Sequence, residues 1–250
     1  MKKILLNGCF GRMGKAITEI VNNNNLCEIC AGVDSFGSGS ANFPTYQNLN
    51  DVKEKADVII DFSHPSALTD LLSFAKSSGT PLVIATTGYS KQQIEEIKDA
   101  SKYIPVFFTF NMSIGINLLT VLSKRAAQIL GDDFDIEIIE KHHNQKLDAP
   151  SGTAIMLANA INEVKNDSMQ YEYDRHSRRM VRPNNEIGIH SVRCGSIVGE
   201  HEVIFAGKDE IISLTHTATS RDIFANGAVK AALFIYDKNP GIYDMSQMIK

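Results

Sequence analysis

The sequence contains no apolar run long enough to cross a membrane. Near the N-terminus two lysines precede the apolar residues Ile4–Leu6, but Asn7 and Gly8 end this run well short of the apolar core of a secretory signal. We therefore expect a cytoplasmic protein with no membrane partner.

An excess of basic residues is also missing, since 25 Lys and Arg are balanced by 29 Asp and Glu and the formal net charge is −4. Nucleic-acid-binding proteins usually present a basic surface, so this balance argues against a nucleic-acid partner. Small anionic ligands are not excluded, because local groups can hold them. Internal repeats and low-complexity tracts are absent, and 43% hydrophobic with 22% charged residues is typical of a globular protein.

Cysteine is scarce, with four in the chain. Cys27 and Cys30 form a C-x-x-C, a spacing that can indicate redox or zinc chemistry. They lie in a predicted strand, however, where residues three apart face opposite sides. Since no second pair or nearby histidine completes a site, we expect ordinary buried thiols and no metal.

The first half of the chain alternates strand and helix patterns. Asp57–Phe62 is almost continuously apolar, which is typical of a parallel strand covered on both faces. Strands separated by helices predict an α/β fold with a Rossmann-type, doubly wound parallel sheet. The predicted strands are Lys2–Asn7, Glu28–Val33, Asp57–Phe62, Pro81–Ala85 and Ile104–Phe108, and the predicted helices run from Met13 to Val21, Leu68 to Ala75 and Lys91 to Ala100.

The pattern changes after Asn111. A helix is expected from Leu118 to Ile129, and Phe134–Glu140 alternates apolar and acidic residues, as a strand with one solvent-facing side would. A helix follows Pro150-Ser151-Gly152, and Asp167–Asn185 is interpreted as a long solvated loop. Closely spaced strands then indicate an inserted α+β domain built on a mixed sheet. These strands are Ile187–Arg193, Ile197–Ala206 and Glu210–Thr217, and a last helix runs from Phe224 to Ile235.

Three glycines, Gly8, Gly11 and Gly14, directly follow the first strand and open the first helix. A tight turn, close approach of a pyrophosphate and close helix packing all favour glycine, and the helix N-terminus attracts phosphates. Asp34 ends the second strand about 20 residues later, where it can bind adenosine ribose hydroxyls. The alternative is a glycine turn with an unrelated aspartate.

The cofactor preference depends on charge beside the ribose. Asp34 repels a 2′-phosphate and Ser35 supplies no cation, whereas Arg12 can reach such a phosphate. We therefore predict NADH or NADPH as cofactor, with NADH used at least as well as NADPH. The segments Asp61–Pro65 and Ala85–Gly88 lie at carboxyl ends of parallel strands, where such folds bind ligands, although either could be only a cap or a turn.

The segment Glu140–Thr153 (EKHHNQKLDAPSGT) carries the densest chemistry. Reduction of a C=N or conjugated C=C bond needs a proton as well as a hydride, and a histidine or lysine can supply it. Ser151, Gly152 and Thr153 at a helix N-terminus offer N–H groups to a carboxylate. Alternatively, the adjacent histidines bind a metal, although they lack H-x-x-x-H spacing, or the segment is only a helix start beside a solvated Lys146.

This segment resembles the signature of bacterial dihydrodipicolinate reductases, and so do NGCFGRMG, DFSHP, ATTG, FNMSIGIN, GSIVGEHEVIFAG and SRDIFANGA, in the same order. The resemblance implies reduction of a cyclic unsaturated dicarboxylate to tetrahydrodipicolinate on the diaminopimelate route to lysine. It further implies that His142 is the acid/base residue, that Lys146 is a proton donor, and that His143, Gly152 and Thr153 bind substrate.

For the cofactor, the resemblance implies two groups of contacts. The adenosine and pyrophosphate side is expected at Gly8, Cys9, Phe10, Gly11, Arg12, Met13 and Asp34, and the nicotinamide side at Ala85, Thr86, Thr87, Thr109, Phe110, Asn111 and Met112. Some members carry arginine where this chain has Ser35, and Asp167–Asn185 matches the family poorly.

The resulting prediction has three parts: residues 1–112 bind dinucleotide, residues 113–220 bind substrate and form a homotetramer, and residues 221–250 return to the first domain. Two other functions stay open at this point. One is a different two-domain dehydrogenase of a small amino or keto acid. The other is a non-catalytic dinucleotide-sensing regulator, which would need no proton donor beside an anion cradle.

Overall fold

A computed structural model describes residues 1–249. The chain divides into two compact units: unit 1 comprises Met1–Ile114 and Asp222–Lys250, and unit 2 comprises Gly115–Arg221. Within the described residues, no helix is both long enough and apolar enough to cross a membrane.

Unit 1 is built on a seven-stranded sheet in the order β12-β6-β5-β4-β1-β2-β3, with all neighbouring strands parallel. This confirms the predicted doubly wound sheet. The short strands β3 and β12 were not predicted, because two or three residues carry no periodicity. The strands are β1 (Lys2–Asn7), β2 (Cys27–Val33), β3 (Thr45–Tyr46), β4 (Val58–Asp61), β5 (Leu82–Ile84), β6 (Pro105–Phe108) and β12 (Gly241–Tyr243).

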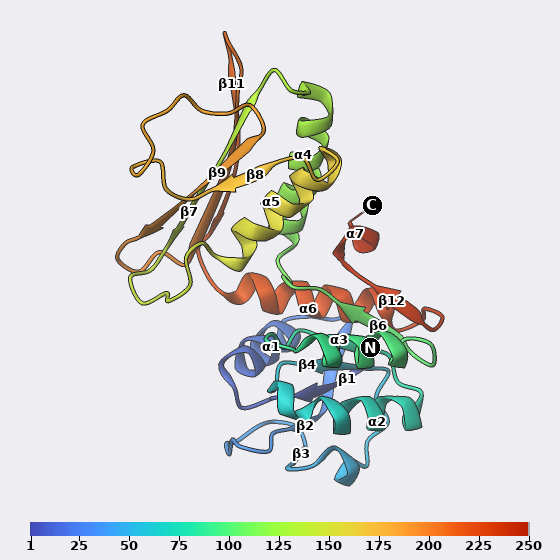
Figure 1. The fold of residues 1–250 in the computed structure, drawn as a ribbon. Coiled ribbons are helices and arrows are strands. Elements are labelled where there is room, and N and C mark those ends of the chain that lie inside the picture. Colours follow the sequence, from blue (N-terminus) through green and yellow to red (C-terminus); the bar gives the residue numbers. More distant parts are fainter. Residues whose placement is uncertain (250) are drawn as a thin grey trace. The chain divides into compact units, whose positions relative to one another are not determined.

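Alternate residues of the central strands enter two separate cores. Ile4 and Leu6 of β1 pack with α1 (Arg12–Asn22) and α6 (Asp222–Ile235), whereas Leu5 packs with α2 (Leu68–Ser78) and α3 (Lys91–Ala100). Figure 1 shows α6 on one side of these strands and α2 on the other. Both faces are therefore covered, which explains why the sequence of these strands is apolar without alternation. The remaining short elements are η1 (Leu49–Asp51), η2 (Pro65–Ala67) and α7 (Met245–Met248).

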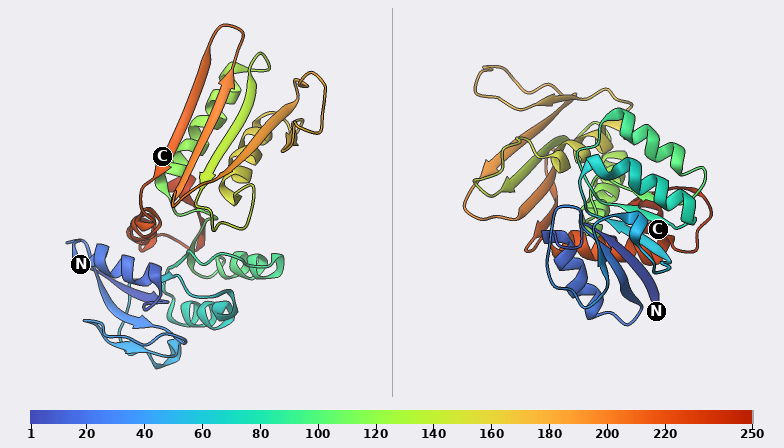
Figure 2. Two further views of the ribbon diagram at one scale, coloured as in Figure 1. Left: turned by 90° about the vertical axis from the view of Figure 1, so that its left-hand side faces the viewer. Right: turned by 90° about the horizontal axis from the view of Figure 1, so that it is seen from below.

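Unit 2 is built on a mixed sheet in the order β11-β10-β7-β9-β8, in which β7–β9 and β8–β9 are parallel and the other pairs antiparallel. The predicted mixed sheet is thus confirmed. Figure 2 shows β7, β9, β10 and β11 side by side, with α4 and α5 on one face. The elements are α4 (Ile114–Leu130), β7 (Asp135–His142), α5 (Gly152–Val164), β8 (Gln170–Glu172), β9 (Glu186–Arg193), β10 (Gly199–Ala206) and β11 (Ile211–Ala218).

The prediction of a long solvated loop at Asp167–Asn185 is wrong for Gln170–Glu172, whereas residues 173–185 form no helix or strand and most of them are exposed. The segment contributes β8, and its arginines pair with carboxylates: Arg182 lies 2.6 Å from Asp135 and 3.1 Å from Glu137. Arg178 lies 2.6 Å from Glu172, which is buried. Asp135 and Glu137 are remote in sequence from Arg182, so composition alone did not reveal these two pairs. A further ion pair joins Arg175 to Glu186, and Arg179 is exposed.

A second correction concerns β7. Its acidic residues were predicted to line the solvent-facing side, but Glu140 lies on the buried face with Ile136 and Ile138 and has no exposed surface. Only Asp135 and Glu137 follow the expected pattern. The physical reason is a set of hydrogen-bond donors around the Glu140 carboxylate.

Gly227 of α6 supplies a test of the packing in unit 1. A Cβ at this position would overlap the main-chain carbonyl of Met112. Backbone cannot yield as a flexible side chain does, so Gly227→Ala should lower the free energy of unfolding by about 2 to 4 kcal/mol despite alanine's higher helix propensity. Denaturant unfolding measures this, with Lys230→Ala on the exposed face as the control. Equal stability of the two variants would contradict the packing described.

Candidate functional site

In unit 1 the glycine turn has a backbone that other residues would strain. Gly8 has φ +84°, in the left-handed region, and a Cβ there would overlap the carbonyl of Phe62. A Cβ on Gly14 would overlap the carbonyls of Gly8 and Cys9. Gly11 is the N-cap of α1 and offers no side-chain cap. The first N–H groups of α1 therefore have no acceptor from a capping side chain, which suits an anion.

Asp34 lies directly beside this turn. Its Oδ2 accepts the N–H of Phe10 at 2.9 Å, and its Oδ1 accepts the N–H groups of Phe36 at 3.1 Å and Gly37 at 2.6 Å. The carboxylate is thus held in place by backbone from two segments. A pocket of about 190 Å³ borders it, lined by Asn7, Gly8, Gly11, Asp34, Ser35, Phe36, Phe62, Ser63, His64 and Ala67.

Asp61 begins the predicted ligand segment Asp61–Pro65, but the sequence analysis assigned it no role of its own. It ends β4, is fully buried, and accepts hydrogen bonds from Asn7 Nδ2 at 2.7 Å, Ser63 Oγ at 2.6 Å and Thr86 Oγ1 at 2.7 Å. Burial raises the pKa of Asp61, and these hydrogen bonds oppose the rise. Its position as a single acidic residue at the end of an apolar strand was the sequence feature that could have identified it. The cluster ties together the carboxyl ends of β1, β4 and β5.

The residues predicted for the nicotinamide side differ in exposure. Ala85, Thr86 and Met112 are buried, and the hydroxyl of Thr86 binds Asp61. Thr87 and Phe110 are exposed. Thr109 Oγ1 donates to the carbonyl of Asn111 at 3.3 Å, which shapes the turn after β6. All belong to unit 1, at or beyond the carboxyl ends of β5 and β6.

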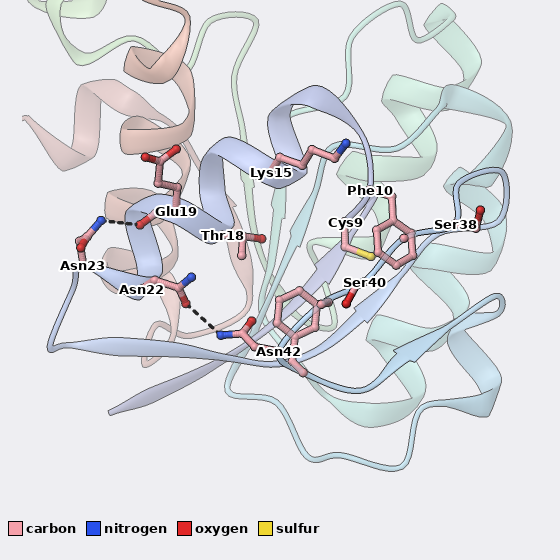
Figure 3. A pocket seen from close by; sticks show the side chains of 13 residues that line it. Cys9, Phe10, Lys15, Thr18, Glu19, Asn22, Asn23, Ser38, Ser40 and Asn42 are labelled. Carbon is pink, nitrogen blue, oxygen red and sulfur yellow. Dashed lines mark hydrogen bonds between the residues drawn. The ribbon is translucent and has the colours of Figure 1, made fainter.

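Another pocket of unit 1 lies between α1 and the segment 38–43 (Figure 3). It has about 670 Å³ and is lined by exposed polar side chains such as Lys15, Glu19 and Asn42. Only Cys9 and Phe10 are shared with the predicted cofactor residues. Burial raises the pKa of Cys9 to about 11, so its thiol is protonated near neutral pH. Nothing in this pocket suggests chemistry.

In unit 2, Glu140 is the centre of a buried network. Arg193 donates to both of its oxygens, from Nη1 to Oε2 at 2.8 Å and from Nη2 to Oε1 at 2.7 Å. His142 Nδ1 lies 2.6 Å from Oε2, and the Ser151 N–H donates to Oε1 at 3.0 Å. Burial opposes ionisation, but the hydrogen bonds from Arg193 and His142 outweigh it and lower the pKa of Glu140 to about 2.

Two further histidines lie in this region. His201 stacks edge-on against His142 with ring centroids 5.1 Å apart, and its Nε2 lies 3.0 Å from Ser151 Oγ. Burial lowers the pKa of His201 to about 3, so the ring is neutral at neutral pH. Burial also lowers the pKa of His142, although its hydrogen bond to Glu140 opposes the shift. His143 is held by Arg221, which lies 3.4 Å from its Nε2, while its buried Nδ1 has no hydrogen-bond partner.

The structure brings most of the predicted substrate residues together around the start of α5. Ser151 is buried and caps the helix, with its Oγ accepting the N–H of Ala154 at 3.1 Å. Gly152 follows, is exposed, and has open space where a Cβ would stand. Lys146 is anchored 2.8 Å from Asp148 and influences His142 electrostatically. Among residues 1–249 no group of three or more His, Cys, Asp or Glu is placed to hold a metal.

The fold and these sites define a class: a two-unit α/β protein in which a Rossmann-type sheet is interrupted by a mixed-sheet unit. The family model described as dihydrodipicolinate reductase, N-terminus, matches residues 2–112, and the one described as dihydrodipicolinate reductase, C-terminus, matches residues 115–249.

Relatives of known name match over the whole chain. The 4-hydroxy-tetrahydrodipicolinate reductase of Clostridium novyi (strain NT) is 50% identical over 250 residues, covering 100% of this chain and 99% of that protein. The protein of the same name from Caldanaerobacter subterraneus subsp. tengcongensis is 48% identical, with the same coverage. The solved dipicolinate-bound dihydrodipicolinate reductase from Paenisporosarcina sp. TG-14 is 26% identical with a TM-score of 0.82, covering 98% of this chain and 97% of that one. The chain belongs to the dihydrodipicolinate reductase family.

The network around Glu140 predicts a pH-dependent contribution to stability. The folded pKa lies near 2, below the ordinary 4.5, so ionised Glu140 stabilises the fold above about pH 4.5 and this stabilisation is lost as the pH falls toward 2. The contribution is about 3 kcal/mol. Between pH 5 and 2, the free energy of unfolding should therefore fall less in Glu140→Gln than in the unaltered protein. Parallel pH curves for the two proteins would contradict the assignment.

Proposed function

We propose that this protein reduces 4-hydroxy-tetrahydrodipicolinate to tetrahydrodipicolinate with NADH or NADPH, in lysine biosynthesis through diaminopimelate. The observation that carries the proposal is the full-length match, at 50% identity, to a protein named for this reaction. The overall change consumes NAD(P)H and a proton, and releases NAD(P)⁺, water and the reduced ring. The bound dinucleotide supplies the hydride.

The proposed cofactor contacts follow from the geometry of unit 1. The uncapped N-terminus of α1 and the bare backbone of Gly8 and Gly11 suit the pyrophosphate. Asp34, oriented by backbone N–H groups, accepts the hydroxyls of the adenosine ribose. The loops after β5 and β6 are assigned to the nicotinamide side, where Thr87 and Phe110 have the most exposed surface and Ala85, Thr86 and Met112 shape the wall.

The proposed substrate contacts lie at the start of α5. Two carboxylates need cations and N–H donors, and Gly152, Thr153, His143 and Lys146 supply them. Ser151 was expected to contact substrate directly, but its N–H binds Glu140 and its hydroxyl binds His201 and Ala154. We therefore assign Ser151 to fixing the helix start at which the carboxylate binds.

Proton transfer is assigned to His142 and Lys146. A proton must reach the ring atom next to the carbon that receives the hydride, and both residues carry exchangeable protons in the segment that binds the carboxylates. Lys146 is held by Asp148, and His142 by Glu140. Both groups therefore have defined positions.

The assembly is proposed to be a homotetramer built through the sheet of unit 2. Strand β11 is an edge strand of this sheet, with β10 as its neighbour on one side. Ile211, on β11, is 69% exposed. An unpaired edge with exposed apolar residues favours covering by another chain. Light scattering on purified protein measures the assembly directly.

Replacing His142 or Lys146 by alanine should lower kcat by about 10² to 10⁴, the range for a lost general acid. Dinucleotide affinity should stay within about twofold, because neither residue belongs to unit 1. Turnover is followed with freshly made synthase product, and binding by fluorescence of the reduced dinucleotide. Gln145→Ala in the same segment serves as the control. Near-normal turnover in either alanine variant would overturn the role of the residue replaced, and binding without any turnover in the unaltered protein would favour a dinucleotide sensor.

For the cofactor, kcat/KM with NADH should equal or exceed that with NADPH, because Asp34 repels a 2′-phosphate and Ser35 adds no cation. Arg12→Ala should lower kcat/KM for NADPH about tenfold while leaving NADH nearly unchanged, since only NADPH carries the phosphate that Arg12 could reach. Steady-state kinetics with both dinucleotides measure these values. A hundredfold preference of the unaltered protein for NADPH would refute the prediction.

A further inference from the structure

We infer that Glu140 is a positioning residue for His142: it fixes the proton on His142 Nδ1, presents Nε2 as the reactive nitrogen and holds the substrate-binding segment at the same point. The inference rests on the proposed function, in which His142 transfers the proton. It goes beyond that function, because neither the reaction nor a histidine proton donor by itself requires a buried acid hydrogen-bonded to the histidine.

The contacts leave Glu140 no freedom to turn. Its carboxylate accepts two hydrogen bonds from Arg193 and one each from His142 and the Ser151 N–H, and a hydrogen bond from Ser191 also lowers its pKa. The donors come from three elements, namely β9, β7 and the start of α5. A buried carboxylate with this many donors is ionised, so it can only accept a hydrogen bond from His142.

The tautomer of His142 follows from this. Since Glu140 cannot donate, the proton of the neutral ring must lie on Nδ1, and Nε2 carries the free lone pair. Nε2 faces Gly199 on β10, where a Cβ would stand only 3.1 Å away. The glycine keeps the space beside the reactive nitrogen free of a side chain.

The same carboxylate also controls the loop before α5. Arg193, held by Glu140, donates from Nη2 to the carbonyl of Asp148 at 2.5 Å. Asp148 in turn anchors Lys146. The position of both proposed proton-transfer groups therefore depends on Glu140, through one hydrogen bond for His142 and through Arg193 and Asp148 for Lys146.

Charges from every neighbouring element act on His142. Glu140 on its own strand favours the imidazolium, whereas Lys146 from the following loop and Arg193 from β9 disfavour it. His201 from β10 is neutral near pH 7 and adds little charge. Glu140 is thus the one stabilising charge among the groups that the structure places against the ring, and its removal should lower the pH at which the imidazolium loses its proton.

The chain supplies a matched control on the same strand. Glu137 is also bound by arginines, Arg175 and Arg182, and its Oε2 lies 2.7 Å from His190 Nε2. It is three residues before Glu140 and therefore faces the opposite side of β7, about 10 Å away along the strand. Glu137→Gln removes an equivalent carboxylate from an equivalent Glu–His–Arg cluster without touching His142.

The experiment compares Glu140→Gln with Glu137→Gln in the purified enzyme, using kcat from pH 5.5 to 9. Glu140→Gln should lower kcat roughly tenfold to a hundredfold, the range typical of a residue that orients a functional histidine. In the proposed function protonated His142 gives up the proton, so the fall of kcat at high pH should move to lower pH when the carboxylate is removed. Glu137→Gln should keep the unaltered kcat and pH profile, whatever its loss of stability. An unshifted profile in Glu140→Gln, or equal losses in both variants, would overturn the inference.

A second measurement does not depend on the fold of Glu140→Gln. In the unaltered enzyme labelled with ¹⁵N-histidine, His142 should give the signals of a ring protonated at Nδ1 when neutral, and His142→Asn identifies these signals by their loss. A neutral ring protonated at Nε2 would overturn the inference. If His142→Ala retains normal turnover, the proposed function of His142 fails instead, even where the tautomer is as expected.

Discussion

Glu140 carries its charge on the buried face of strand β7, in line with the apolar Ile136 and Ile138 and with His142. An unpaired buried charge costs several kcal/mol, so unit 2 depends on the groups that compensate it. The pairing of β7 with β9 supplies the main one, because the register that sets Glu140 opposite Ser191 also sets His142 opposite Arg193. Strand pairing, the ion pair and the start of α5 are therefore parts of one arrangement. Removing the charge affects all three.

Unit 1 also contains a buried acidic residue that is held by hydrogen bonds. Asp61 is also a fully buried acid at the end of a strand, but it has no cationic partner among its hydrogen bonds and is surrounded by amide and hydroxyl donors. Asn7 and Thr86 come from the ends of β1 and β5, which flank β4. Neutral donors hold the strand ends together without adding positive charge there. Glu140 in unit 2, in contrast, is bonded by the cation of Arg193.

The long elements were predictable because each has a strong period or an unbroken apolar run, as in Asp57–Phe62. The glycine turn and the chemical segment were recognisable because their residue types recur at fixed spacing. What escaped prediction depends on contacts between distant residues. The pairing of Arg182 with Asp135 joins residues 47 positions apart and is invisible locally, so the whole segment 167–185 looked solvated. Glu140 looked solvent-facing for the same reason, since its partner Arg193 lies 53 residues further along the chain.

The sheet of unit 1 is completed by residues that come late in the chain. Helix α6 completes the cover of the face on which α1 also packs, and β12 extends the sheet beyond β6. Unit 2, in contrast, is a continuous stretch, Gly115–Arg221. During synthesis this stretch leaves the ribosome before α6 exists, so unit 2 can reach its folded state while one face of the parallel sheet is covered by α1 alone. That face carries Ile4, Leu6 and Val83, and until α6 emerges it is the surface that a chaperone would have to shield from aggregation.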